Sequence, residues 1–325
     1  MTADVLFDDR SARVDRTTGW ERVTRELATR LGDDPRVSLS SAPARSVAGR
    51  LASDVALVPL KARKFRIVHY PSYPPTWKLR RNLVIFTLND LTWWEHPETS
   101  SRLGRWWYRP WADRAIGRAH LTVPTNATAS ALAERFGINH DRMTVIPWGV
   151  TTLPPAVPFE APRPFIVFVG SREPRKNLER LVRAFETSAL SDEFDLVLVG
   201  REAWGPPVRG VRTISGASDE VMSGIYSAAV ALVMPSLHEG FGLPLVEALV
   251  AGLPVACSDI PVFREVAGPH ATYFDPLDEC DIARALHEVV RAPPTDEAAR
   301  RAWASRFSWD AAARSCLELY ERLLA

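Results

Sequence analysis

The chain has 325 residues, 46% apolar and 24% charged, a composition that excludes intrinsic disorder, and its three widely spaced cysteines indicate neither a disulfide framework nor a zinc site. Lys and Arg outnumber Asp and Glu by 23 to 15 in residues 1–150 and trail them by 17 to 24 in 151–325, so we expect the basic half to meet the acidic half or an anionic partner. The N-terminus lacks the apolar stretch of a signal peptide and no run approaches the roughly 20 residues of a membrane span, so we expect a cytoplasmic protein.

In the first half, apolar runs of strand length alternate with segments of helical period, the pattern of a parallel sheet covered by helices. The predicted strands are 5–9, 37–41, 67–70, 82–88, 120–125 and 143–148. The predicted helices are 20–31, 102–119 and 126–136. Residues 151–164 contain five prolines, which predicts a stiff linker.

The alternation restarts in the second half. The predicted strands there are 165–170, 194–200, 211–215, 231–236 and 254–259, and helices are expected from Asn177, from Ser218 and around Glu247. We therefore predict an α/β protein with two doubly wound domains, 1–152 and 160–308. No Gly-x-Gly-x-x-Gly follows either first strand, so the best signal of a dinucleotide-dependent oxidoreductase is missing.

The most informative segment is HEGFGLPLVEALVAGLPVACSDIPVFREVAG, which starts at His238. Gly240 and Gly242 allow a tight turn with outward N–H groups, and Pro244 suits the first position of a helix. This pattern predicts an anion-binding helix N-terminus.

Two carboxylates bracket that turn. Glu239 precedes the helix and Glu247 lies about one turn inside it, where paired carboxylate oxygens suit the vicinal hydroxyls of a sugar or ribose. N–H groups for a diphosphate and carboxylates for diols together predict a nucleotide-sugar site. The alternative is an ordinary amphipathic helix with incidental acidic neighbours.

Basic residues follow the first strand of the second half. The turn SREPRKN, residues 171–177, brings Arg172, Arg175 and Lys176 to the strand end, where cations can neutralise a diphosphate leaving group. The alternative is a solvated helix N-terminus capped by Asn177. Basic residues at that end oppose the helix dipole, which favours the functional interpretation.

These segments resemble the donor-binding signature of glycosyltransferase family 4, retaining enzymes of the GT-B fold in which two glutamates stand eight positions apart. The resemblance covers essentially the whole chain. It implies two Rossmann-like domains facing each other across a cleft, with an acceptor-binding domain at 1–152 and a nucleotide-sugar-binding domain at 160–308. It also implies that the last helix, 309–325, packs back on the first domain, although a helix packed on its own domain is the alternative.

The resemblance assigns roles to individual residues. Glu239 would position the donor sugar and Glu247 the ribose, while Lys176, with Arg172 or Arg175, would stabilise the departing diphosphate without a metal. The catalytic residues implied are Glu239, Lys176, Arg172 and Asp90. Further donor contacts are implied for Gly170, Gly216, Ala217, Gly240, Phe241, Gly242 and Leu243.

In the first half, the turn RTTGWERVTREL resembles the family's opening loop, with Gly19 near the donor phosphates and Thr18 competing as a simple helix cap. Asn89 and Asp90 stand where most relatives have His-Asp, and Asn89 would contact the donor sugar. An asparagine exchanges hydrogen bonds with a sugar hydroxyl but cannot carry a proton. Asp90 orients the loop or the acceptor in one interpretation and caps a turn in the other. Two later turns match the family as well, at Thr125 and Gly149.

Basic and aromatic residues interleave in RLGRWWYRPWADRAIGRAH, where five arginines surround three tryptophans: Arg102, Arg105, Arg109, Arg114 and Arg118 with Trp106, Trp107 and Trp111. Such a segment fits peripheral contact with an anionic membrane, or an anionic or aromatic acceptor. The alternative is a core helix, interrupted by Pro110, whose aromatics pack on the sheet. No nucleic-acid motif accompanies the charge, so we expect no nucleic-acid partner.

The sequence therefore predicts a retaining hexosyltransferase that uses a nucleoside-diphosphate sugar, needs no cofactor or metal, and works in the cytoplasm or against the inner face of the plasma membrane. The acceptor would be a glycan or lipid-linked molecule in cell-surface polysaccharide synthesis. GDP-mannose is the favoured donor because the Glu-Pro-Arg-Lys-Asn turn resembles that of polysaccharide mannosyltransferases. The alternatives are a transferase acting on a small natural product, an altered binding module at the membrane, or an epimerase or phosphorylase on the same scaffold.

Overall fold

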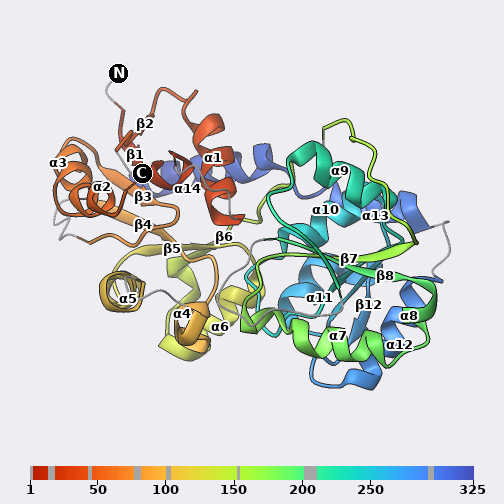
Figure 1. Ribbon diagram of the computed structural model, residues 1–325. Helices are drawn as coiled ribbons and strands as arrows, with labels where there is room; N and C mark the ends of the chain where they lie inside the picture. The colour runs from red at the N-terminus through yellow and green to blue at the C-terminus, as the bar shows by residue number, and fades with distance from the viewer. Residues whose placement is uncertain are drawn as a thin grey trace. The chain divides into compact units, whose positions relative to one another are not determined.

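The computed structural model describes residues 3–13, 19–42, 46–76, 82–99, 104–151, 154–200, 211–291 and 296–325. Thr18 and Arg102 lie outside these ranges. The chain divides into two compact units, Met1–Gly149 with Ser308–Ala325 and Val150–Phe307 (Figure 1). Among the described residues, no helix combines the length and the apolar character needed to cross a membrane.

The first unit is built on a six-stranded parallel sheet in the order β2-β1-β3-β4-β5-β6. Its strands are Val5–Phe7 (β1), Val37–Leu39 (β2), Ile67–Tyr70 (β3), Leu83–Thr87 (β4), His120–Val123 (β5) and Met143–Val145 (β6). Its α-helices are Gly19–Leu31 (α1), Val47–Ala52 (α2), Val58–Ala62 (α3), Thr92–Glu95 (α4), Arg109–Ile116 (α5), Asn126–Phe136 (α6) and Trp309–Leu324 (α14). Ser53–Leu57 (η2) and Gly104–Tyr108 (η4) are π-helical, and Arg10–Arg13 (η1), Pro97–Thr99 (η3) and His140–Arg142 (η5) are 3-10 turns.

The second unit has its own six-stranded parallel sheet, in the order β12-β11-β10-β7-β8-β9. Its strands are Phe165–Val169 (β7), Asp195–Val199 (β8), Arg212–Ile214 (β9), Ala231–Met234 (β10), Val255–Ser258 (β11) and Thr272–Phe274 (β12). Its α-helices are Leu178–Glu186 (α7), Leu190–Glu193 (α8), Asp219–Ala228 (α9), Leu243–Ala251 (α10), Pro261–Ala267 (α11), Glu279–Val289 (α12) and Glu297–Ala304 (α13), with 3-10 turns at Pro174–Lys176 (η6) and Gly268–His270 (η7).

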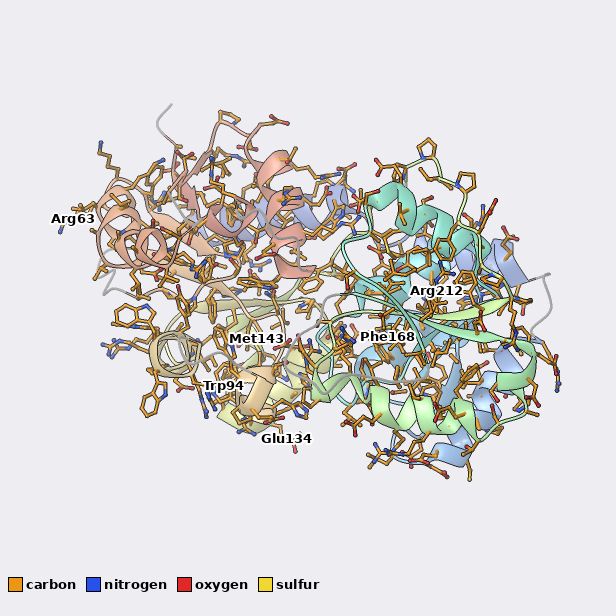
Figure 2. All side chains as sticks on the ribbon, in the orientation of Figure 1. Arg63, Trp94, Glu134, Met143, Phe168 and Arg212 are labelled. Carbon is orange, nitrogen blue, oxygen red and sulfur yellow. The ribbon has the colours of Figure 1, made fainter. Side chains whose placement is uncertain are left out.

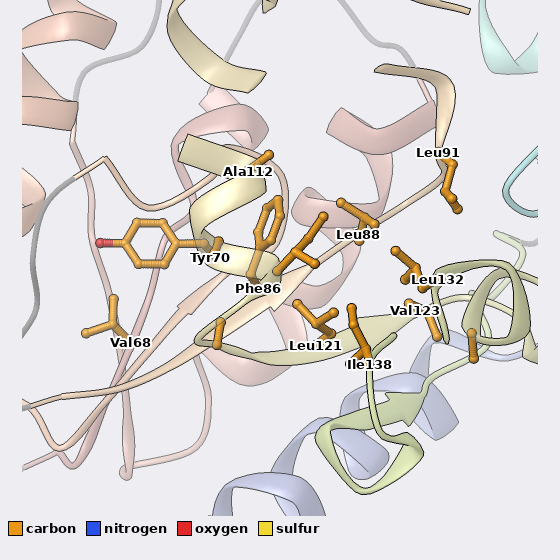
Figure 3. Packing of buried hydrophobic residues seen from close by; sticks show 14 of the residues in the cluster. Val68, Tyr70, Phe86, Leu88, Leu91, Ala112, Leu121, Val123, Leu132 and Ile138 are labelled. Carbon is orange, nitrogen blue, oxygen red and sulfur yellow. The ribbon is translucent and has the colours of Figure 1, made fainter. Parts of the chain in front are cut away.

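Apolar side chains between sheet and helices form the core of the first unit. Phe86 of β4 pairs in register with Leu121 of β5, and both are almost fully buried. Figure 3 shows these two side chains in the same cluster of buried residues as Leu132 of α6. Removing a side chain of this size from water stabilises a fold by about 1.5–3 kcal/mol, so the parallel strands with continuous apolar runs hold the unit together.

The C-terminal helix α14 belongs to the first unit. The buried His69 ring of β3 lies between the Tyr320 hydroxyl of α14, 2.6 Å from Nδ1, and the Thr87 hydroxyl, 2.8 Å from Nε2. Gly149 packs against the start of α14. A Cβ at this position would lie 2.1 Å from the Trp309 backbone nitrogen. A glycine there lets the chain approach the start of the helix closely.

Each sheet has one point at which consecutive crossovers leave in opposite directions. In the second unit this point lies between β7 and β10, which are neighbours in the sheet although about 60 residues separate them in sequence. In the first unit it lies between β1 and β3. Loops at the carboxyl ends of such strand pairs diverge and leave room for a ligand.

Every strand that the sequence predicted is present. The unpredicted elements include β12, the segment α2-η2-α3, and the helices α4, α8, α11, α12 and α13. The helix predicted for 102–119 changes character at Pro110: the π-helical η4 ends at Tyr108, and α5 begins at Arg109 with Pro110 in its first turn, a position that suits proline.

Candidate functional site

The loop after β7 is held in place by its own carboxylate. The Ser171 hydroxyl donates to Glu173 Oε1 at 2.6 Å, and Arg175 Nε donates to Glu173 Oε2 at 2.8 Å. Arg175 Nη1 also donates to the carbonyl of His238 at 3.1 Å, in the loop after β10. Glu173 and Arg175 therefore tie together the two loops that leave the switch point of the sheet.

Lys176 and Glu239 meet at this switch point. The Lys176 ammonium donates to Glu239 Oε1, which also accepts from the Ser236 hydroxyl at 2.9 Å, while Arg175 Nη1 lies 3.2 Å from Oε2. Lys176 and Glu239 are both buried. A carboxylate has about four acceptor sites, so three donors leave Glu239 able to accept one more hydrogen bond, for example from a sugar hydroxyl.

The charged groups of this cluster change one another's pKa values. Burial alone would raise the pKa of the Glu239 carboxyl, but the Lys176 and Arg175 cations outweigh it and lower that pKa to about 2. Burial lowers the pKa of the Lys176 ammonium, against the opposing pull of Glu239. We conclude that Glu239 is ionised at neutral pH and that the site combines a fixed anion with two cations.

Glu247 projects from α10 toward α9. The buried Tyr226 hydroxyl donates to Glu247 Oε2 at 2.8 Å, and both side chains are almost fully buried. The hydrogen bond from Tyr226 fixes the orientation of this carboxylate. No local pattern signals this contact, because 21 positions separate the two residues.

Helix α10 begins directly after a glycine in a left-handed conformation. Gly242 has φ 87° and ψ 56°, and a Cβ there would lie 2.7 Å from Phe263 Cε1. Pro244 occupies the first turn. The segment therefore has the tight turn and helix start that the sequence predicted, on the loop that also carries Glu239.

The other predicted residues of the second unit have varied surroundings. The Phe241 side chain is buried against Phe307 with ring centroids 5.4 Å apart, so only its backbone remains for a ligand. Gly170 lies beside Lys176, where a Cβ would be 3.7 Å from Lys176 Cε. Gly216 is exposed in a left-handed turn with open space around it, and Ala217 follows it. Two further predicted positions, Arg172 and Leu243, are buried.

Asn177 does not cap α7, contrary to the alternative considered for this turn. It takes a left-handed conformation with φ 56°, and its side chain accepts from no backbone N–H of the first turn: Nδ2 donates to the carbonyl of Pro276 at 2.7 Å, and Oδ1 accepts from the Arg180 side chain of α7 at 2.6 Å. The side chain thus ties the loop after β7 to the segment after β12. The arrangement favours the functional interpretation of the basic residues that precede it.

In the first unit, Asn89 and Asp90 follow β4. Asp90 Oδ1 accepts from the Thr92 backbone N–H at 2.9 Å, which is the turn-capping role considered for it. Asn89 Oδ1 and Thr92 Oγ1 are buried and, among the described residues, neither has a hydrogen-bond partner. Such orphaned atoms are costly, so they mark a place where a ligand group can bind. Gly19, the remaining predicted residue, starts α1 and is exposed.

One charged cluster of the first unit was missed by the sequence analysis. Arg10, at the end of β1, donates through Nε and Nη2 to Asp8 at 2.6–2.9 Å and through Nη1 to Asp54 Oδ1 at 2.5 Å. All three side chains are almost fully buried. Asp54 is far away in sequence, so nothing in the local pattern pointed to the pair.

Two family models match the chain. The model described as Glycosyl transferases group 1 matches residues 151–306, and the model described as Glycosyltransferase Family 4 matches residues 23–152. The chain belongs to glycosyltransferase family 4. Its two Rossmann-like units, each with a parallel six-stranded sheet, are those of the family's GT-B fold.

Relatives of this family 4 chain include characterised transferases. It is 36% identical over 141 residues to the serotype-specific mannosyltransferase WbdA of Escherichia coli, covering 39% of this chain and 17% of that protein. It is 29% identical over 265 residues to the MMP alpha-(1->4)-mannosyltransferase of Mycolicibacterium hassiacum, covering 71% of this chain and 64% of the relative. The chain thus spans about a sixth of the first relative and just under two thirds of the second.

A solved structure shares the fold over nearly the whole chain. Anabaena Alr3699/HepE in complex with UDP-glucose superimposes with a TM-score of 0.75 at 17% sequence identity, covering 98% of this chain and 99% of the other. At this identity the likeness concerns the fold alone.

Proposed function

We propose that this chain is a retaining glycosyltransferase that moves a hexose from a nucleoside-diphosphate sugar to a glycan or lipid-linked acceptor in cell-surface polysaccharide synthesis. GDP-mannose is the donor we favour. The family and the two mannosyltransferase relatives support transfer of mannose. The turn at residues 173–177 supports the guanine nucleotide only by its resemblance to polysaccharide mannosyltransferases.

The observation that carries the proposal is the contact of Lys176 and Arg175 with Glu239 at the switch point of the second sheet. Cations and a helix N-terminus gather where a parallel sheet binds its ligand, and a carboxylate lies among them. An anion flanked by hydroxyl groups, such as a sugar diphosphate, matches this combination of charges.

The chemistry follows from the charge that develops during transfer. As the anomeric carbon–oxygen bond breaks, negative charge gathers on the diphosphate, and Lys176, Arg175 and the N-terminus of α10 stabilise it without a metal ion. The departing phosphate accepts the acceptor's proton on the face from which it leaves. Attack from that same face retains the anomeric configuration, and Glu239 holds the donor sugar in position.

Tyr226 and Glu247 complete the donor site in this proposal. Glu247 accepts hydrogen bonds from the ribose hydroxyls while Tyr226 keeps its carboxylate oriented. In the first unit, Asn89 Oδ1, which has no hydrogen-bond partner among the described residues, is free to accept a hydrogen bond from a sugar hydroxyl. Because an amide carries no proton, Asn89 acts in binding and not as an acid or base.

Calorimetric titration with donor sugars tests the proposal. GDP-mannose should bind, and Lys176→Met should weaken binding by about ten-fold or more, as expected for a lost charge-assisted hydrogen bond of roughly 1.5–3 kcal/mol. Arg183→Met is the matched control, because Arg183 lies on α7 and pairs with the exposed Glu279. Equal affinity of both variants for the donor would contradict the site.

Donor choice and stereochemistry need their own measurements. Binding of GDP-mannose should be compared with binding of the glucose donors of UDP, ADP and TDP, and preference for one of these would replace our choice of donor. Proton NMR of the product at first turnover should show the anomeric configuration of the donor. An inverted product would overturn the proposed mechanism while leaving the donor site intact.

A further inference from the structure

Helices α2 and α3, joined by η2, have an unusual outer face. Of the eight large apolar side chains that are exposed among the described residues, five lie in residues 47–60 and 104–108. They are Val47, Val55, Leu57, Leu60 and Trp106. Trp106 is 82% exposed. Single exposed apolar residues are common, whereas a group of this kind marks an interaction surface.

These segments pack on the core through their other side. Val58 and Ala62 of α3 are buried in the hydrophobic core of the first unit, while Leu57 and Leu60 point away from it. A helix on a protein surface normally presents polar residues outward. Here both faces are apolar, so the outer face is not explained by packing within the chain.

A buried carboxylate joins η2 to η4. Asp54 of η2 accepts from the Tyr108 hydroxyl at 3.1 Å and from Trp107 Nε1 at 3.4 Å, and its other oxygen binds Arg10. Trp107 and Tyr108 therefore turn inward, and Trp106 turns out to solvent. Both segments are π-helical, a rare conformation that is frequent at functional sites. The buried contacts of Asp54 thus hold the two segments, each with its exposed apolar residues, next to each other.

The charges around this surface are basic. Residues 46–66 contain five basic residues and one acidic residue, and the acid is Asp54, which is buried against Arg10. Arg63, Lys64 and Arg105 are exposed, and none of them forms an ion pair with any residue in the described ranges. Figure 2 shows Arg63 at the outer side of α3, pointing away from the sheet.

We propose that this docking face, formed by Val47, Val55, Leu57, Leu60 and Trp106 with Arg63, Lys64 and Arg105, binds the surface of an anionic lipid bilayer. Apolar side chains and tryptophan enter the headgroup boundary, and exposed cations attract acidic headgroups. Facing copies of one positive surface repel each other, which favours lipid over self-association. The tryptophan-rich segment considered from sequence contributes Trp106 and Arg105, while Trp107 is turned inward.

Vesicle co-sedimentation tests the docking face on the full chain. The protein should sediment with vesicles of phosphatidylcholine and phosphatidylglycerol, and much less with phosphatidylcholine alone or at high salt. Leu60→Asp and Trp106→Asp, on two different elements, should each lower binding about ten-fold or more. Leu277→Asp is the matched control, because Leu277 is 65% exposed in the second unit.

The basic residues have a separate test. Arg63→Gln and Lys64→Gln should each lower binding about five-fold, since a cation near an anionic surface contributes about 1 kcal/mol. Arg291→Gln, an exposed arginine of the second unit, should leave binding unchanged. Circular dichroism of each variant checks that the fold is kept.

Three results would overturn this inference. The first is that the protein does not bind phosphatidylglycerol vesicles, and the second is that all variants bind them equally. The third is that the protein does not bind vesicles but forms a dimer, which Leu60→Asp dissociates. The last would assign the face to a second copy of the chain. The vesicles contain neither donor nor acceptor, so none of these results bears on the proposed transferase activity.

Discussion

Replacing Lys176 with methionine should destabilise the second unit by about 2–3 kcal/mol. Burial opposes ionisation of Glu239, but the Lys176 and Arg175 cations outweigh it and hold the pKa of this carboxyl at about 2, so the ion pair favours the folded state. Arg175 and Ser236 stay in contact with Glu239 in the variant, so only part of this stabilisation is lost. Removing one partner of a buried ion pair costs roughly 3–5 kcal/mol in general, which agrees in size.

A double-mutant cycle isolates the contact between the two charges. Glu239→Gln alone leaves the Lys176 ammonium buried beside an amide, whereas Lys176→Met with Glu239→Gln removes both charges together. The double variant should therefore lose less stability than the sum of the single variants, by about 2 kcal/mol. Arg183→Met is again the control and should change stability by less than about 1 kcal/mol, because its ion pair is exposed.

Hydrogen exchange followed by mass spectrometry is the suitable assay, because peptides from β7 and β10 report on the second unit separately from the first. The free energy of opening is measured in these peptides for the natural chain, the two single variants and the double variant. If the two single effects add within about 0.5 kcal/mol, the charges do not interact. The arrangement derived for Lys176 and Glu239 would then be refuted.

Three more predictions concern both units. Glu247→Ala should weaken donor binding by about 1–3 kcal/mol and Tyr226→Phe by about 1 kcal/mol, as measured by calorimetry, and unchanged affinity in both would contradict the ribose site. Burial lowers the pKa of His69 to about 3, so stability is complete above pH 6.5 and falls as the pH drops, by about 2 kcal/mol at pH 5. Urea unfolding at pH 7 and 5 should show this loss in the natural chain and not in His69→Gln. Gly149→Ala should lower the melting temperature, because its Cβ would lie 2.1 Å from a backbone nitrogen, while Gly117→Ala, with its closest contact at 3.7 Å, should leave it within about 2 °C.

Local patterns predicted the strands and singled out the residues of the candidate site, because both depend on neighbours in the chain. Apolar runs of five or six residues showed β7 and β10, and the turns after them showed Lys176 and Glu239. Parallel strands with long crossovers follow from the alternation of strand and helix. Which of Arg172 and Arg175 contacts the diphosphate stays a prediction, since both lie in the same turn; the fold adds that Arg175 reaches Glu239.

Contacts between distant segments were decided by the tertiary structure. The pairing of Arg10 with Asp54 and the inward turn of Trp107 depend on how η2 and η4 pack, and no periodicity in either segment records it. The outward face of Leu57 and Leu60 was hidden for the same reason: an apolar run predicts burial, and only packing shows which of its sides remains in water. Sequence determined the strands and the chemistry carried by their loops, whereas the sheet order brought two of those loops together, because hydrogen bonding between β7 and β10 is a property of the folded chain.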